Sequence, residues 1–426
     1  MEFRMALNAI LESLRAVMKN NKIIILLYGI LARLLGLVIP VKKGCWIFGS
    51  DIGRTYREGS KYLIEYMLKM HPEYECYFVT QAKEVREALE RRNIPCIMNI
   101  SLRGIWITAR AECVFTTQLS SDIIFAFKKP GRRFYYLVHG QPYKVALATL
   151  AKTDYAKKHA AKATVVPLLR SWLSHCFVCD YVCYDSEFVS ATSEFLSKFQ
   201  KLDFGENMPS RILGMPRNDA LFQPERMSGE KWIGDTSGKF IVSYMPTHRQ
   251  YGRGAFSPTP FANRKDVQDW MIENNVLLVV KNHPTMLLYQ KNEHPFESAC
   301  IKDITSAKID PMTVLYHSDV LITDYSSVWM DYLLMRRPII FYIYDNFVKD
   351  DVGVYYDIHD EHVGHFCNSE DELFALLKSV KANYKSMCPK DEVVQKFHKY
   401  VDGNSCERYY ESICNDSKSY LNQKRN

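Results

Sequence analysis

The stretch DVLITDYSSVWMDYLLMRRPIIFYIYD (residues 319–345) is predicted to form two strands joined by a helix. Its first part (319–327) and its last part (338–345) are short apolar runs rich in Val, Ile, Tyr and Phe, which are typical of strands. The paired serines Ser326 and Ser327 stand where the first strand turns into the helix. This order of elements predicts parallel strands connected by a helical crossover.

The same alternation of apolar runs and amphipathic segments extends over the chain from residue 44. In the first half, predicted helices occupy 57–70 and 82–92, and predicted strands occupy 45–50, 75–80, 94–98, 112–117, 134–139 and 181–186. In the second half, further predicted strands occupy 211–213, 239–246 and 276–284, and the fold ends on helices at 370–384 and 391–403. We therefore predict an α/β fold of two Rossmann-like halves whose strand ends face one cleft.

The length of 426 residues exceeds one ordinary hydrophobic core, so two domains are expected. The polar stretch at 200–210 marks the boundary between them, and another polar stretch at 224–239 is predicted to be a surface loop. An N-terminal apolar segment, two Rossmann-like domains and a C-terminal tail are predicted at residues 1–43, 44–205, 206–405 and 406–426.

Composition and charge indicate a globular protein with an anionic partner. Hydrophobic residues make up 47% and charged residues 24% of the chain, an ordinary balance for a folded protein. The formal net charge of +7 suits phosphate groups or an anionic lipid surface. Because no concentrated basic stripe is present, nucleic acid is not among the expected partners.

The cysteines are the candidate metal ligands. The twelve cysteines show no paired framework, which indicates reduced thiols in a cytosolic compartment. The cluster HCFVCDYVC (175–183) contains one Cys-x-x-Cys pair, but no second pair follows at a metal-ligand spacing. We therefore favour small apolar residues over a metal site there. No Asp-x-Asp pair indicates a divalent metal, and no cofactor is predicted.

Residues 23–41, IIILLYGILARLLGLVIPV, are apolar apart from Arg33 and carry lysines on both sides. A segment of this length could just cross a bilayer, but a charge at the centre of a span is costly. We predict a membrane-associating helix that lies in the plane of the bilayer surface. A true span and a helix packed on the protein's own surface are the two alternatives.

Polar clusters follow five of the predicted strands. They are His139 after YYLV, LGMPRND (213–219), THR (247–249), KNHP (281–284) and TDYSS (323–327). Because ligands bind at the carboxyl ends of parallel strands, we expect these clusters to face one cleft. Alone, His139 is more typical of a histidine in a turn or in the core, but its place among four other clusters makes a role in proton transfer a candidate.

These clusters suit the binding of phosphate groups. Ser326 and Ser327 would offer hydroxyl and backbone donors at a helix start, although a plain N-cap has the same pattern. Asp331 lies one helical turn further on and could face the same ligand. Long cations able to reach a diphosphate follow three strands, namely Arg217, Arg249 and Lys281. Two histidines that could donate to phosphate oxygens stand close by, namely His248 and His283.

In this order and spacing, the segments HGQPYK, LGMPRND, YMPTHR, KNHP and LITDYSSVWMDYLLMRRPIIFYIYD resemble the CDP-glycerol glycerophosphotransferase family. The resemblance covers about residues 44–400. Members of that family prime and polymerise teichoic acids and related capsular polymers in bacteria. The resemblance implies a GT-B architecture, peripheral association with the cytoplasmic face of the cell membrane, and transfer of a polyol phosphate from a CDP-activated donor with release of CMP.

The resemblance also implies a role for each matching residue. His139 corresponds to the general base. The implied substrate-binding residues are Gly140, Gln141, Pro142, Tyr143, Arg217, Pro246, Thr247, Arg249, Lys281, Asn282, His283, Ser326, Ser327 and Asp331. The chain departs from the family's usual pattern at Gln141, at His248 and at the pair Lys281–Asn282, which leaves the donor alcohol open.

We therefore predict an enzyme that transfers glycerol phosphate from CDP-glycerol to a lipid-linked or polymeric acceptor at an anionic membrane surface. Residues 44–205 are expected to serve the acceptor and residues 206–405 the donor. CDP-ribitol is the alternative donor, and a nucleotide-sugar glycosyltransferase or a catalytically silent scaffold are the alternative functions. A single addition and repeated polymerisation are both compatible with these residues.

Overall fold

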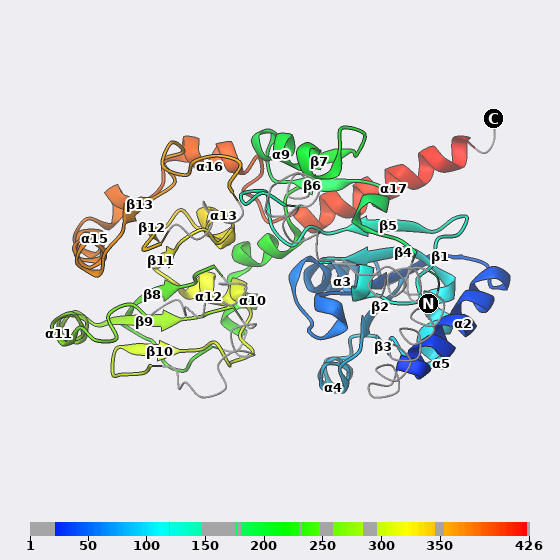
Figure 1. Cartoon of the computed structure of the whole chain (residues 1–426), viewed down its shortest axis with the longest axis horizontal. Coiled ribbons are helices and arrows are strands. Elements are labelled where there is room, and N and C mark those ends of the chain that lie inside the picture. The colour runs from blue at the N-terminus through cyan, green and yellow to red at the C-terminus, as the bar shows by residue number, and fades with distance from the viewer. Residues whose placement is uncertain are drawn as a thin grey trace, which may run out of the picture.

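The computed structural model describes residues 22–118, 120–146, 176, 180–229, 232–247, 259–283, 296–345 and 353–423. Within these ranges the chain forms two parallel β-sheets flanked by helices, one sheet in each half of the molecule (Figure 1). The expected α/β fold with two parallel sheets is thereby confirmed.

The first sheet has the strand order β3-β2-β1-β4-β5, and every neighbouring pair is parallel. Its strands are β1 (Lys42–Phe48), β2 (Glu75–Thr80), β3 (Cys96–Met98), β4 (Ala111–Thr116) and β5 (Arg133–Tyr136). The crossover helices are α3 (Glu58–Met70), α4 (Lys83–Arg91) and α5 (Leu102–Arg110). Because helices cover the sheet, its central strands are apolar on both faces, as Trp46, Ile47 and Phe48 show.

The second sheet has the order β10-β9-β8-β11-β12-β13 and is also parallel throughout. Its strands are β8 (Phe240–Tyr244), β9 (Val276–Val280), β10 (Ile301–Asp303), β11 (Val320–Thr323), β12 (Ile339–Tyr342) and β13 (His365–Cys367). The helices around it are α11 (Lys265–Glu273), α12 (Pro311–His317), α13 (Val328–Leu333), α15 (Glu370–Ala382) and α16 (Asp391–Phe397). The strand order reverses between β8 and β11, and such a switch point is where ligands bind in sheets of this kind.

A separate two-stranded sheet lies at the expected boundary between the halves. It pairs β6 (Val189–Ala191) with β7 (Ser210–Ile212), and α9 (Glu194–Phe204) connects the two strands. The prediction that residues 211–213 begin the second sheet is therefore wrong. The chain leaves β7 at Gly214, whose φ of +82° and close approach to Ser405 require glycine. The placement of the domain boundary stays a prediction.

Two other local predictions are wrong. Residues 181–186 do not form a strand but contain the 3-10 turn η3 (Cys183–Asp185), because the Asp185 carboxylate accepts a hydrogen bond from the Val182 amide and closes the turn. The polar stretch 224–239 is not all loop, since it begins with α10 (Pro224–Gly229), where Pro224 starts the helix at a position that tolerates proline.

The last long helix, α17 (Ser405–Gln423), runs back across the first half (Figure 1). Its first turn is capped by Asp219, whose carboxylate accepts hydrogen bonds from the amides of Ser405 and Cys406. Further along, Arg211 forms an ion pair with Asp416. The segment predicted to be a tail thus starts inside a helix that ties the two halves together.

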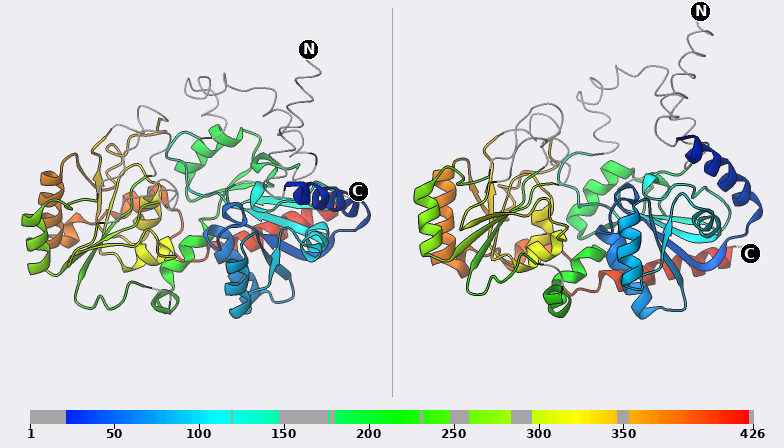
Figure 2. Two further views of the ribbon diagram at one scale, coloured as in Figure 1. Left: turned by 60° about the horizontal axis from the view of Figure 1, so that its bottom comes forward. Right: turned by 90° about the horizontal axis from the view of Figure 1, so that it is seen from below.

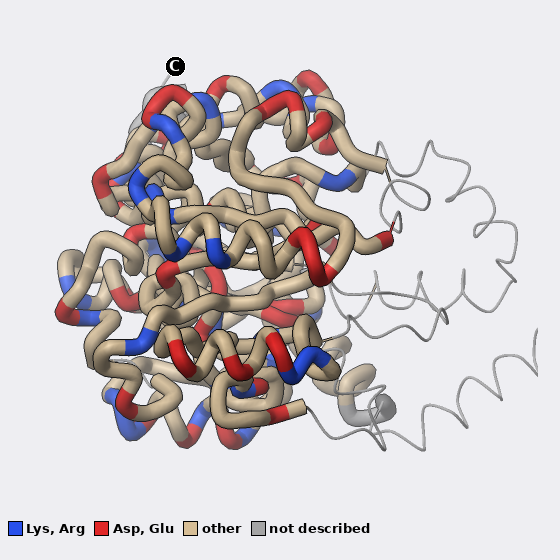
Figure 3. The backbone as a smooth tube through the Cα atoms, turned by 90° about the vertical axis from the view of Figure 1, so that its left-hand side faces the viewer, with Lys and Arg blue, Asp and Glu red and all other residues tan. Residues whose placement is uncertain are grey.

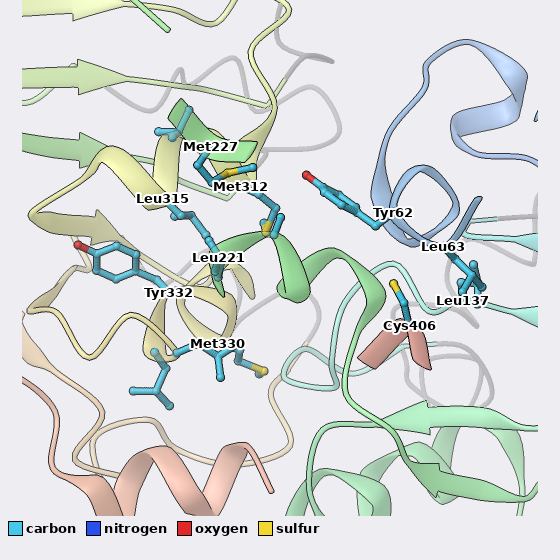
Figure 4. Packing of buried hydrophobic residues seen from close by; sticks show 14 of the residues in the cluster. Tyr62, Leu63, Leu137, Leu221, Met227, Met312, Leu315, Met330, Tyr332 and Cys406 are labelled. Carbon is cyan, nitrogen blue, oxygen red and sulfur yellow. The ribbon is translucent and has the colours of Figure 1, made fainter. Parts of the chain in front are cut away.

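The halves also share one hydrophobic core, seen in Figure 4. The 3-10 helix η4 (Pro216–Phe222) lies between them and packs against α3, α12 and α17. The core residues labelled in Figure 4 come from α3, the chain after β5, η4, α10, α12, α13 and α17, among them Tyr62, Leu137, Leu221, Met312 and Tyr332. A buried ion pair of 2.9 Å between Lys61 of α3 and Asp310, the residue before α12, bridges the same junction. The two halves are therefore packed against one another through side chains as well as joined by the chain.

Helix α2 (Lys22–Val38) lies at the end of the molecule that is far from the second half (Figure 2). One side of it packs on the first half through Ala32, which contacts the cluster around Ile105 and Phe125. Arg33 faces the protein, where it forms an ion pair with Asp180 and lies 4.3 Å from the centre of the Phe127 ring. The opposite side is apolar and exposed, at Leu27, Ile30, Leu34, Leu37 and Val38. In the described part of the chain, no helix has the length and apolar character needed to cross a membrane.

Candidate active site

The segment after β5 carries His139 to the junction of the two halves. Leu137 and Val138 are buried, and the Leu137 amide still donates to the carbonyl oxygen of Thr116 in β4. The regular strand ends at Tyr136, three residues earlier than predicted, and the Tyr136 amide donates to the hydroxyl of Ser186. The His139 side chain is then 49% exposed. The chain therefore delivers an accessible imidazole at the end of a buried run.

Gly140 brings this segment against the second half. A Cβ added to Gly140 would lie 2.9 Å from the hydroxyl oxygen of Ser327, at the start of α13. The Ser327 side chain forms no capping hydrogen bond with α13, so the interpretation of this serine as a plain N-cap is not supported. Two segments that were predicted to share the site, 139–143 and 323–327, are thus in contact.

A buried cluster of charges lies under His139. Arg217 donates from Nη2 to Asp331 at 2.8 Å and from Nε to the same carboxylate at 3.2 Å. Its Nη1 donates to Glu58 and to the main-chain oxygen of His139, both at 2.5 Å. The sequence predicted that Arg217 would reach a diphosphate and that Asp331 would face the ligand. The structure pairs the two with each other, so both have a structural role that was not expected, and a donor contact stays a prediction.

The pKa values in this cluster follow from burial and from the paired charges. Burial alone would raise the pKa of Glu58, but His139 and Arg217 lower it below its usual value. Burial raises the pKa of Asp331 in spite of the opposing effect of Arg217. Burial would lower the pKa of Arg217, yet the carboxylates of Asp331 and Glu58 raise it. Glu58 and Arg217 are therefore both charged at neutral pH.

Lys281 and Asn282 follow β9, as predicted, and both are buried. Among the described residues, none forms a hydrogen bond or ion pair with the Lys281 ammonium group. Burial lowers its pKa, the charge of Asp310 raises it, and the nearby Arg57 lowers it. Since Arg57 is also the neighbour of Glu58 in the chain, Lys281 lies at the same junction as the charge cluster. A buried cation of this kind suits an anionic ligand.

Asp324 holds two strand-end loops of the second sheet together. Its Oδ1 accepts hydrogen bonds from the amides of Thr247 at 2.7 Å and Ser326 at 3.2 Å. The loops after β8 and β11 therefore meet at the switch point of the sheet, and the predicted neighbourhood of Pro246, Thr247 and Ser326 is present.

Gln141, Pro142 and Tyr143 are used for packing. The Gln141 side chain donates to the Ser190 carbonyl and accepts from the Thr192 amide. The Pro142 carbonyl oxygen accepts from the Tyr356 hydroxyl, and Tyr143 is buried. These residues attach the site segment to its surroundings, and their expected contacts with substrate stay predictions.

The remaining predicted residues are placed differently. His283 is exposed at the end of a described range, and His248 and Arg249 lie outside the described residues. Of the cysteine cluster, Cys176 and Cys183 are described and are free thiols, whereas His175 and Cys179 lie outside. The described ranges contain no group of three His, Cys, Asp or Glu side chains arranged to hold a metal ion.

Two site residues were missed from the sequence, namely Arg57 and Glu58. Asp324 lies within the predicted cluster TDYSS (323–327), where it is the first carboxylate after a buried strand, but no role of its own was predicted for it. Arg57 and Glu58 belong to a charged segment with an ordinary helical pattern. No local sequence feature distinguishes Glu58 from the rest of the 48 acidic residues in the chain. Basic and acidic residues are interspersed along the described chain in the same way (Figure 3).

Comparisons with known proteins bear on the family and the fold of this chain. Residues 31–415 match the family model described as CDP-Glycerol:Poly(glycerophosphate) glycerophosphotransferase. The chain is 25% identical over 419 residues to the teichoic acid poly(glycerol phosphate) polymerase of Bacillus spizizenii, covering 94% of this chain and 99% of that protein. It is 27% identical over 244 residues to a teichoic acid poly(ribitol-phosphate) polymerase of the same organism, covering 53% of this chain and 37% of that protein.

A solved structure of the wall teichoic acid polymerase TagF superimposes with a TM-score of 0.70 and 19% identity. The alignment covers 97% of this chain and 99% of that one. At this level of identity the likeness establishes a shared fold.

Proposed function

The chain belongs to the CDP-glycerol:poly(glycerophosphate) glycerophosphotransferase family, and we propose that it transfers glycerol phosphate from CDP-glycerol to a hydroxyl group of a lipid-linked or polymeric acceptor. The observation that carries the proposal is the half-exposed imidazole of His139, which lies beside Glu58 and next to a glycine, Gly140, that packs closely against Ser327 in the serine turn of α13. Geometry of this kind suits a base that works on a hydroxyl group at the edge of a phosphate site.

In the proposed reaction, His139 takes the proton of the acceptor hydroxyl while its oxygen attacks the phosphorus that carries glycerol. A new oxygen–phosphorus bond forms, and the bond to CMP breaks with the electron pair leaving on CMP. Lys281 and the turn at Ser326 and Ser327 offer positive charge and hydrogen-bond donors to the phosphate oxygens. Phosphoryl transfer depends mostly on positioning and electrostatics, which such groups supply.

We assign the donor to the second half and the acceptor to the first, in a GT-B-type arrangement. The loops after β8, β9 and β11 carry Thr247, Lys281 and Ser326, and they gather at the switch point of the second sheet. Ribitol phosphate is the second candidate group, because a poly(ribitol-phosphate) polymerase is among the relatives. The proposed product is a teichoic acid-like or capsular polymer.

The function is tested by offering CDP-glycerol, CDP-ribitol and UDP-sugars separately to the full chain with a lipid-linked polyol-phosphate acceptor. We expect CMP to be released from CDP-glycerol and the acceptor to gain mass by one or more glycerol phosphate units. Release from CDP-ribitol alone would transfer the assignment to the second candidate. Release of UDP alone would make the protein a sugar transferase, and no turnover with any donor would favour a scaffold.

For localisation, we propose that the protein lies at the cytoplasmic face of the membrane with the exposed side of α2 in contact with lipid. Leu34 and Leu37 are 58% and 80% exposed on this side, while Arg33 is turned toward the protein. An apolar helix side bound in the interface is stabilised by about 1.5–3 kcal/mol for each large side chain that enters it.

The double variant Leu34→Gln, Leu37→Gln is expected to lower binding to anionic vesicles by at least about tenfold, measured by co-sedimentation. Because both side chains face away from the protein, its thermal stability should not change. Leu202→Gln in α9, which alters a leucine that is 50% exposed elsewhere, is the control. Equal binding of the double variant and the control would argue against α2 as the contact.

A further inference from the structure

Glu58 is held at the first position of α3 in a conformation that L-residues rarely adopt, with a φ of +60°. The start of this helix is pressed against the chain that leads to His139. A Cβ added to Gly59 would lie 3.2 Å from the Cβ of Leu137, two residues before the histidine. An unusual backbone conformation at a buried carboxylate is a sign that the position of that carboxylate matters.

The two oxygens of Glu58 point to different partners. Oε1 lies 3.5 Å from Nδ1 of His139, and Oε2 lies 2.5 Å from Nη1 of Arg217. The same Nη1 donates to the main-chain oxygen of His139. Glu58 and Arg217 therefore hold the histidine by its ring and by its backbone, respectively. With Nδ1 beside the carboxylate, Nε2 is the ring nitrogen that is left for substrate.

Charged groups from several surrounding elements face this histidine. Two carboxylates, Glu58 of α3 and Asp331 of α13, share the single guanidinium of Arg217. Arg57 also lowers the pKa of Glu58, but it forms its own ion pair with the carboxylate of Asp51 at 3.0 Å. The Glu58 and Asp331 side chains are only 10% and 3% exposed, so solvent screens them weakly.

We propose that Glu58 is a positioning residue for His139, orienting Nε2 toward the acceptor hydroxyl and favouring the imidazolium that forms when the proton moves. The proposal rests on the proposed function in that His139 acts there as the base. Arg217 also donates a hydrogen bond to Asp331 in the second half. The orientation of the His139 ring therefore depends on how the two halves are packed. The competing explanation is that Glu58 only pairs with Arg217 to join the halves.

The variant Glu58→Gln separates the two explanations, because glutamine keeps the size and can still accept from Arg217 but carries no charge. In the full chain, we expect kcat with CDP-glycerol to fall by at least about tenfold while the KM for the donor changes little. The rising limb of the pH–rate profile should move about one unit to lower pH, because the imidazolium loses its partner.

The matched control is Glu65→Gln. Glu65 lies in the same helix and also forms ion pairs with two side chains, Arg92 and Arg226, but it has no contact with His139. It should lose stability without a shift of the pH profile. A Glu58→Gln variant that behaves as Glu65→Gln does would leave only the structural role.

A readout that needs no turnover keeps this test separate from the proposed function. The protonation of His139 can be followed by NMR on protein with labelled histidine, using His139→Gln to identify its signal. We expect the midpoint of protonation to lie at lower pH in Glu58→Gln than in wild type or Glu65→Gln. Equal midpoints in all three proteins would overturn the proposal. A wild type that is inactive with every CDP-polyol would instead overturn the proposed function.

Discussion

His139→Ala is expected to lower the turnover of CDP-glycerol by about 10²–10⁴-fold, the contribution that a single general base usually makes. The side chain is 49% exposed and packs little, so the fold should be unaffected. Binding of the donor, measured by calorimetry with CDP-glycerol, should change little, because the proposed donor contacts lie in the second half.

The control for this variant is His359→Ala, which removes an exposed histidine that stacks on Phe366 in the second half. Turnover in that protein should stay close to the wild-type value. If His139→Ala retained turnover as well, the assignment of the base would be wrong, whatever the donor.

Arg217→Ala is expected to destabilise the protein by about 3–5 kcal/mol, the usual cost of removing one partner from a buried ion pair. The loss is large because the substitution leaves two buried carboxylates, Glu58 and Asp331, without their shared cation. It also removes the hydrogen bond to the main chain of His139, so turnover should fall together with stability. Chemical denaturation followed by tryptophan fluorescence measures the first effect, and CMP release measures the second.

Arg264→Ala is the matched control, since Arg264 also pairs with two carboxylates, Asp266 and Asp371, but at the surface. Exposed ion pairs contribute little, so this variant should unfold at nearly the wild-type denaturant concentration. Arg217→Lys keeps the charge but cannot form the two-pronged contact with Asp331, and it should lie between wild type and Arg217→Ala. Identical unfolding of Arg217→Ala and Arg264→Ala would contradict the role of the cluster.

The strands and helices that build the two sheets could be predicted because their signals are local. A strand covered by helices on both faces must be apolar along its length, as VLLVV in β9 is, and the helix that follows or precedes it must be amphipathic. The prediction of a strand failed at 181–186, where Asp185 lies inside the apolar run and closes a turn by accepting a hydrogen bond from the Val182 amide.

Part of the site could be predicted for the same reason. Once parallel strands are inferred, the residues after them must gather at one edge, which brought Thr247, Lys281 and Ser326 into the prediction. His139 was also found in this way, although the strand ends three residues before it. The partners of these residues could not be predicted, because the sequence around a charged residue in a helix does not indicate which distant residue it pairs with.

By itself, the sequence determined the α/β architecture, the family and the segments that carry the site. These could be predicted because the spacing of apolar residues and the ends of strands depend on residues that are neighbours in the chain. Only the tertiary structure decided what Arg217 does. Its partners Glu58 and Asp331 lie 159 and 114 residues away in the chain. They meet where the two halves pack, and burial there makes one guanidinium and two carboxylates dependent on each other.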